Sequence, residues 1–175
     1  MVSNFSYMSN LFSRSEDAVE LAHIIKLLGV IPDVCVEEYI VNFFRDLKVQ
    51  KRNIYCLDPT LAKFENLKVL NLSFNSITKI EFLPPNLEEL YLNGNQVIEV
   101  ALNPTRPLTK MVHLGLSMNK IRNTALSLIV KVFPNLFCLD VSFNDLCDLE
   151  SAITWCKQLK SLKMLFMEGN PLVFT

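Results

Sequence analysis

The fold of this chain is decided by residues 67–80, which read LKVLNLSFNSITKI. Apolar residues recur at fixed steps in this stretch, and Asn75 follows the last leucine of its L-x-L segment. The same order returns four more times, with asparagines at positions 95, 119, 144 and 170. Successive asparagines are therefore 20, 24, 25 and 26 residues apart, which is the spacing of an internal structural repeat.

The alternation around Leu70 and Leu72 predicts a short β-strand that carries its leucines on one face. One such strand cannot bury that face, so consecutive repeats should stack into a parallel sheet over one continuous core. Each asparagine follows its strand where main-chain groups of the adjoining turns would be buried without partners. We therefore expect a structural ladder of asparagines and not a binding site.

The repeated pattern resembles the leucine-rich-repeat superfamily over residues 44–172. The resemblance implies an α/β solenoid, a right-handed β-α superhelix with a curved parallel sheet. The short repeats and the GNPL segment at 169–172 are similar to the cytosolic subgroup of phosphatase-regulatory and axonemal members. Within it, residues 44–77 resemble an axonemal member, which implies a scaffold in motile cilia with axonemal or dynein-assembly proteins as partners.

Three segments are predicted along the chain. Residues 1–13, rich in Ser and Asn, are expected to be disordered, and residues 14–43 to form a helical N-terminal cap. Residues 44–175 form the repeat domain, with six repeats. The first of these is degenerate, because Arg52 stands at the ladder position and has no hydrogen-bond acceptor. No amphipathic helix follows Asn170, so we expect a fragment or short isoform without its C-terminal cap, or a partner that covers the last repeat.

The segments that connect the strands are predicted to change along the chain. Prolines follow Asn75 and Asn95 and disfavour helix there, whereas residues 124–133 and 150–162 have the length and apolar spacing of α-helices. Such helices would lie on the convex side, behind a concave sheet. Trp155 is expected to pack between the two layers.

Composition excludes several classes of function. Half of the 175 residues are apolar, and 17 basic against 18 acidic residues give a net charge of −1, so direct nucleic-acid binding is not expected. No apolar run reaches the roughly 20 residues that span a bilayer. Five cysteines, an odd number without metal-ligand spacing or a signal-peptide pattern, favour reduced thiols and a cytoplasmic location. We expect Cys147 and Cys156 to be small core residues.

No catalytic constellation stands out. The sequence has no G-x-S-x-G, no glycine-rich phosphate loop, no H-E-x-x-H and no paired cysteine ligands. We therefore predict a non-enzyme without catalytic residues, metal, cofactor or small-molecule ligand.

The remaining candidate is the outer face of the sheet, since the x positions of the repeat point away from the core. The predicted partner-binding residues on this concave face are Asn71, Glu89, Tyr91, His113, Phe137, Asp140, Met164 and Phe166. The alternative is that further C-terminal residues cover the apolar run from Phe137 to Phe166. A regulatory subunit for a protein phosphatase and a ribonucleoprotein assembly component are the other functions left open. Phe74 and Phe143 are expected to pack near the turns, with ligand contact as the less favoured alternative.

Overall fold

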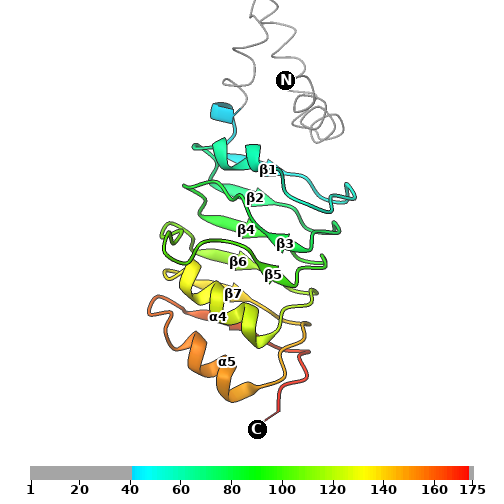
Figure 1. Ribbon diagram of the computed structural model, residues 1–175, viewed down its shortest axis with the longest axis vertical. Coiled ribbons are helices and arrows are strands. Elements are labelled where there is room, and N and C mark those ends of the chain that lie inside the picture. The colour runs from blue at the N-terminus through cyan, green and yellow to red at the C-terminus, as the bar shows by residue number, and fades with distance from the viewer. Residues whose placement is uncertain (1–40, 174–175) are drawn as a thin grey trace, which may run out of the picture.

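The computed structural model describes residues 41–173 of the chain (Figure 1). The predicted disordered N-terminus and most of the predicted helical cap lie outside the described residues. Residues 41–43, at the end of the predicted cap, are helical.

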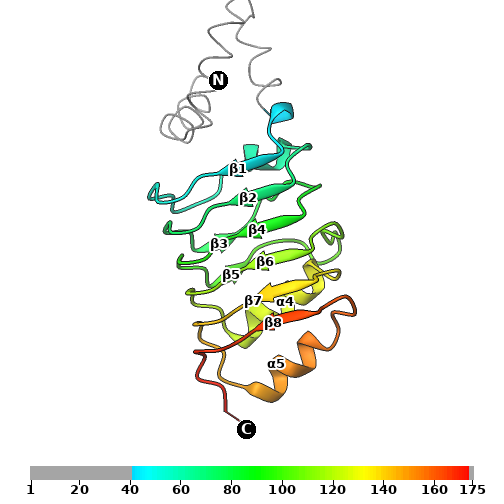
Figure 2. The same ribbon diagram turned by 180° about the vertical axis from the view of Figure 1, so that it is seen from behind.

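Each repeat contributes one strand to a six-stranded parallel sheet. Strands that follow one another in the repeats are neighbours in the sheet, so the stack runs in chain order from one end of the domain to the other (Figures 1 and 2). The strands are β1 (Asp46–Lys48), β2 (Val69–Asn71), β4 (Glu89–Tyr91), β6 (His113–Gly115), β7 (Cys138–Asp140) and β8 (Met164–Phe166). This arrangement confirms the predicted α/β leucine-rich-repeat solenoid.

The early connecting segments are not α-helical, as the prolines after Asn75 and Asn95 predict for the second and third of them. The first contains a 3-10 helix, Pro59–Lys63, and the next two each contribute a two-residue strand. These strands, β3 (Lys79–Ile80) and β5 (Glu99–Val100), pair in parallel as a second small sheet. The Lys79 ammonium lies 3.1 Å from the Glu99 carboxylate across this pair.

The later connecting segments form the helices α4 (Asn123–Val132) and α5 (Leu149–Cys156), which pack side by side (Figure 1). The prediction that the second helix extends to residue 162 is wrong. The helix ends at Cys156 because the following residues must turn the chain back toward the sheet. The N–H of Leu159 donates to the Cys156 carbonyl at 3.0 Å, and the N–H of Lys163 already pairs with Phe137 at 2.9 Å.

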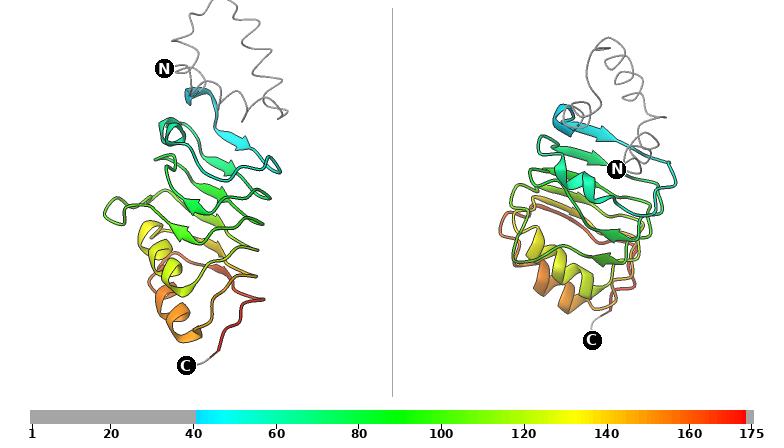
Figure 3. Two further views of the ribbon diagram at one scale, coloured as in Figure 1. Left: turned by 45° about the vertical axis from the view of Figure 1, so that its right-hand side comes forward. Right: turned by 45° about the horizontal axis from the view of Figure 1, so that its top comes forward.

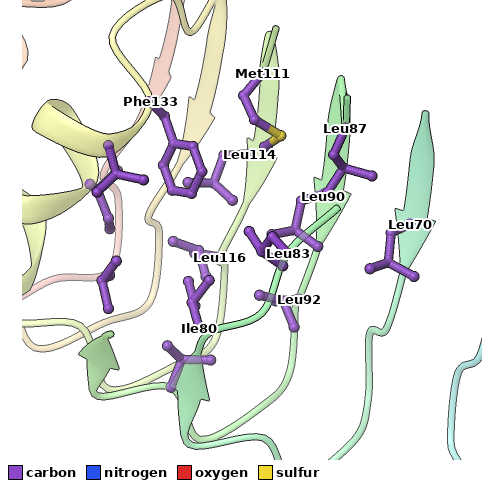
Figure 4. Close-up of a cluster of buried hydrophobic side chains, with 14 of the residues drawn as sticks. Leu70, Ile80, Leu83, Leu87, Leu90, Leu92, Met111, Leu114, Leu116 and Phe133 are labelled. Carbon is purple, nitrogen blue, oxygen red and sulfur yellow. The ribbon is translucent and has the colours of Figure 1, made fainter. Parts of the chain in front are cut away.

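The helices and the small sheet cover one side of the six-stranded sheet and leave its other side bare (Figures 2 and 3). The core lies between these layers, and Figure 4 shows its central part around Leu90, Leu114 and Phe133, which are fully buried. Leu165, at the same position of the last repeat, is 36% exposed because β8 is the edge strand of the sheet. Trp155 is half-buried against the core, as predicted, with the Lys131 ammonium 5.4 Å from its ring centroid.

The asparagines form the predicted ladder. The Asn119 Nδ2 group donates to the carbonyls of Leu92 and Leu116, both at 3.0 Å, and its Oδ1 accepts from the Val97 N–H at 2.9 Å. In the degenerate first repeat the main chain takes part instead, since the N–H of Arg52 donates to Asn75 Oδ1 at 2.9 Å. The ladder therefore begins at Asn75.

The two cysteines predicted to be core residues differ. Cys156 is buried on α5, as expected, and burial raises the pKa of its thiol to about 11. Cys147 is exposed, so that prediction is wrong. It directly follows the buried Leu146 and points the opposite way, and its N–H donates to Asn123 Oδ1 at 3.1 Å. Within residues 41–173, Cys138, Cys147 and Cys156 are free thiols.

Candidate functional site

The bare side of the sheet carries two columns of side chains, which we call the open face. The strand register aligns Asp46, Val69, Glu89, His113, Cys138 and Met164 in one column, and Lys48, Asn71, Tyr91, Gly115, Asp140 and Phe166 in the other. Seven of the eight predicted binding residues occupy these columns, and the eighth, Phe137, directly precedes β7. The structure therefore brings the predicted residues onto one continuous surface, while their role in binding stays a prediction.

The centre of the open face is a cluster around Tyr91. Its hydroxyl donates to the Glu89 carboxylate at 2.7 Å, and its ring centroid lies 4.8 Å from that of His113 at an interplanar angle of 41°. Burial, and then the hydrogen bond and the charge of Glu89, raise the pKa of Tyr91 to about 12. Tyr91 is therefore a neutral, oriented ring at physiological pH.

Gly115 makes room for this cluster. A Cβ atom at Gly115 would lie 2.9 Å from Asn93 Oδ1 and 3.3 Å from Tyr91 Cδ1. Asn93 in turn accepts a hydrogen bond from the N–H of Ser117 at 3.0 Å. The role of Asn93 was missed by sequence reasoning, since it is not among the predicted binding residues. The available signal in the sequence was Gly115, because a glycine among the outward-facing positions leaves room for neighbouring side chains.

The side chains of Asp140 and Asn71 both accept hydrogen bonds from the turns that follow their strands. Asp140 Oδ1 accepts from the N–H of Ser142 at 3.0 Å and from its hydroxyl at 2.6 Å. Asn71 Oδ1 accepts from the N–H of Ser73 at 3.1 Å. An Asn or Asp two residues before a Ser is the sequence signal for this local bond. Asn71 is thus a structural residue as well as a face residue.

Among residues 41–173, the charges of the open face are paired only at its N-terminal end. Lys48 lies 3.5 Å from Asp46, and Lys68 lies 2.7 Å from Glu88 at the margin of the face. Asp140 is not in any of the ion pairs found among residues 41–173. The N-terminal end is therefore close to neutral, whereas the middle is acidic.

The C-terminal end of the open face is apolar. Phe137, Met164 and Phe166, which we call the terminal patch, are 49%, 44% and 43% exposed. They are neighbours, since the Phe137 carbonyl accepts from the N–H of Met164 at 3.1 Å and Phe166 lies two residues beyond Met164 on the same strand. Cys138 lies in the same region but is buried, and burial followed by the charge of Asp140 raises the pKa of its thiol.

Phe74 and Phe143 lie at the turns beside the open face, as predicted. Both have left-handed backbones, with φ of 59° and 52°, and both remain about half exposed. Each ring occupies the space where the next repeat has a glycine. A Cβ atom at Gly94 would lie 2.7 Å from Phe74 Cδ1, and one at Gly169 would overlap the Phe143 ring.

Among residues 41–173, no group of three or more His, Cys, Asp or Glu side chains is arranged to hold a metal ion. None of the helices in the same range combines the length and the apolar character needed to span a bilayer.

Comparisons with known proteins agree with the repeat architecture. Residues 66–85 match the Leucine Rich Repeat family. The chain is similar to leucine-rich repeat-containing protein 43 of Homo sapiens and Mus musculus, with 37% and 35% identity over 145 residues. That alignment covers 81% of this chain but 22% of each relative, so the chain spans about a fifth of their length.

More distant similarities cover less of this chain and show lower identity. Fibromodulin of Homo sapiens is 29% identical over 125 residues, covering 71% of this chain and 32% of that protein. A leucine-rich-repeat protein of Leptospira interrogans has a similar structure, with a TM-score of 0.55 and 22% identity over 77% of this chain and 40% of that chain. At 22% identity, this structural similarity supports the fold only.

Proposed function

Because the chain belongs to the leucine-rich-repeat superfamily, whose domains generally bind other proteins, we propose that it is a non-catalytic scaffold or adaptor with the open face as its binding surface. The observation that carries this proposal is the exposure of the terminal patch. Phe137, Met164 and Phe166 keep between 43% and 49% of their surface in solvent, although they are adjacent and apolar. Contiguous apolar surface of this kind marks interaction sites on soluble domains.

The oriented ring of Tyr91 supports the same proposal. Its hydroxyl is held by Glu89 and its face by His113, so little side-chain entropy remains to be lost on binding. Aromatic residues of this kind are enriched among the side chains that dominate protein interfaces. Tyr91 would therefore act as a rigid anchor near the centre of the surface, with the terminal patch at one end.

The proposed place of action is the cytoplasm, and in ciliated cells the axoneme, with axonemal or dynein-assembly proteins as partners. The free thiols at Cys138, Cys147 and Cys156 support a reducing compartment. The ciliary part rests on the resemblance to axonemal members of the superfamily.

The test compares two variants that each add one carboxylate at an exposed position. Phe166→Glu alters the open face, and Thr154→Glu alters α5 on the opposite side of the domain. Both variants and the wild type are expressed in ciliated cells for proximity labelling, with circular dichroism to check that they fold. We expect Phe166→Glu to lose a set of axonemal or dynein-assembly proteins that Thr154→Glu retains.

Other results would redirect or refute the proposal. Loss of phosphatase subunits with Phe166→Glu would assign a regulatory role to the same surface. Identical protein lists from the wild type and both variants would refute a role for the open face in binding.

A further inference from the structure

The open face combines an apolar end with an acidic centre, and this combination restricts what it binds. The terminal patch lies on and beside β8, and Asp140 lies on β7 next to it, paired in the strand register with Phe166. Neighbouring strands are about 4.8 Å apart. The carboxylate of Asp140 and the apolar surface of Phe166 are thus adjacent sites on one surface.

Within residues 41–173, Asp140 has hydrogen bonds but no ion pair. Its Oδ1 accepts from the main chain and hydroxyl of Ser142, which are neutral donors. The ion pairs found within residues 41–173 are Lys48 with Asp46, Lys68 with Glu88, and Lys79 with Glu99, so none of them neutralises Asp140. Glu89 is in the same situation, because its partner is the neutral hydroxyl of Tyr91. The two carboxylates therefore leave an uncompensated negative charge in the middle of the face.

This negative charge contributes to the pKa shifts of two neighbouring side chains, Tyr91 and Cys138. The pKa of Tyr91 is raised by burial and then by Glu89, and the pKa of Cys138 is raised by burial and then by Asp140. Glu168 adds a further exposed carboxylate beyond Phe166, and Lys163, before Met164, is the nearest basic residue in the sequence of β8 and its flanks. The acidic centre is flanked by the paired charges at one end and by the terminal patch at the other.

We propose that the partner segment of the open face is an amphipathic helix that presents an Arg or Lys to Asp140 and an apolar side chain to the terminal patch. Residues three or four apart on a helix lie about 5–6 Å from each other, which matches the separation of neighbouring strands. A helix that crosses the strands would therefore place one cationic and one apolar residue, a single turn apart, over Asp140 and Phe166. This inference rests on the proposed function and specifies the chemistry of its partner.

The experiment uses a phage library of 16-residue, helix-favouring peptides, selected against the full chain and sequenced. Enriched peptides are then measured by fluorescence anisotropy with the wild type and with the Asp140→Asn and Phe166→Glu variants. Asp145→Asn is the matched control, since Asp145 is an exposed carboxylate that follows the ladder position Asn144 and lies outside the columns of the open face. All variants are checked by circular dichroism.

We expect the enriched peptides to carry Arg or Lys three or four positions from Leu, Met or an aromatic residue. Their affinity should fall roughly tenfold with Asp140→Asn, as for the loss of one charge-assisted contact, and should be unchanged with Asp145→Asn. Higher salt should weaken binding to the wild type more than binding to Asp140→Asn. Reselection on Asp140→Lys should enrich Asp or Glu at the same spacing.

Two results would overturn the inference, and they differ in what they leave standing. Peptides that bind the open face, as judged by loss with Phe166→Glu, but lack basic residues or ignore Asp140→Asn would refute the chemistry and leave the proposed function intact. A selection that yields no peptide sensitive to Phe166→Glu would refute both.

Discussion

The asparagine ladder makes a prediction about cooperativity between repeats, because neighbouring asparagines share carbonyl partners. Leu92 O accepts from Asn95 Nδ2 at 2.9 Å and from Asn119 Nδ2 at 3.0 Å. Either asparagine alone therefore keeps this buried carbonyl paired. The perturbation is the replacement of both by alanine, compared with each single replacement.

The expected loss of free energy of unfolding follows from the main-chain groups that each replacement leaves without a hydrogen-bond partner in the ladder. Asn119→Ala removes the acceptor for the Val97 N–H, and Asn95→Ala removes the acceptor for the Ile77 N–H. Each buried unpaired group costs about 1–3 kcal/mol, so each single variant should lose about that much free energy of unfolding. The double variant also orphans the Leu92 carbonyl, which should add about 1–3 kcal/mol beyond the sum of the two single variants.

The assay is a double-mutant cycle measured by urea unfolding, with an osmolyte present so that the least stable variant remains folded. The matched control is the pair Asn75→Ala and Asn119→Ala. Asn75 donates to Val49, Leu72 and, weakly, Ser73, none of which accepts from Asn119. These two changes should therefore add within about 0.5 kcal/mol.

The shared-carbonyl argument would be refuted if the adjacent pair and the separated pair gave the same coupling energy. It would also be refuted if the effects of Asn95→Ala and Asn119→Ala were additive.

Three further predictions concern packing, titration and thiol chemistry. Gly94→Ala should destabilise the domain by about 1–2 kcal/mol in urea unfolding, since φ is +65° and the new Cβ would meet the Phe74 ring, and Phe74→Ala should remove the steric part of this loss. The pKa of Tyr91 is raised from 10.0 to about 12, so its contribution to stability is complete below pH 10 and is lost as pH rises toward 12. The thermal midpoint of the wild type should therefore fall more steeply than that of Tyr91→Phe over this interval, and parallel curves would contradict the assignment. Cys147, which is exposed, should react rapidly with Ellman's reagent in the native state, whereas the buried thiols of Cys138 and Cys156 should react at the rate of unfolding.

The sequence predicted the sheet well because strand register is set by a side-chain period of two. Leu70, Leu90 and Leu114 face inward and pair in register, so the residues beside them had to face outward in aligned columns. The ladder asparagines were equally predictable, since each has the same position relative to its strand. In both cases a local rule was repeated often enough to fix the three-dimensional arrangement.

Features that depend on contacts between repeats were harder to predict from the sequence. The end of α5 at Cys156 has no glycine or proline to mark it, and it follows from the need to return the chain to Phe137, which directly precedes β7. Cys147 was misplaced because apolar character was given more weight than its position next to Leu146. The cluster of Tyr91 with Glu89 depends on side-chain conformations that a sequence pattern does not contain.

The placement of Phe74 over Gly94 and of Phe143 over Gly169 divides the array into couples. In each couple a ring from one repeat fills the space that the next repeat leaves open, so the two repeats have to be gained or lost together. The fourth repeat, with Met118 at this position, stands between the couples and belongs to neither. As far as these contacts between ring and glycine are concerned, a change in the number of repeats, by duplication or by excision, is therefore least disruptive at the fourth repeat.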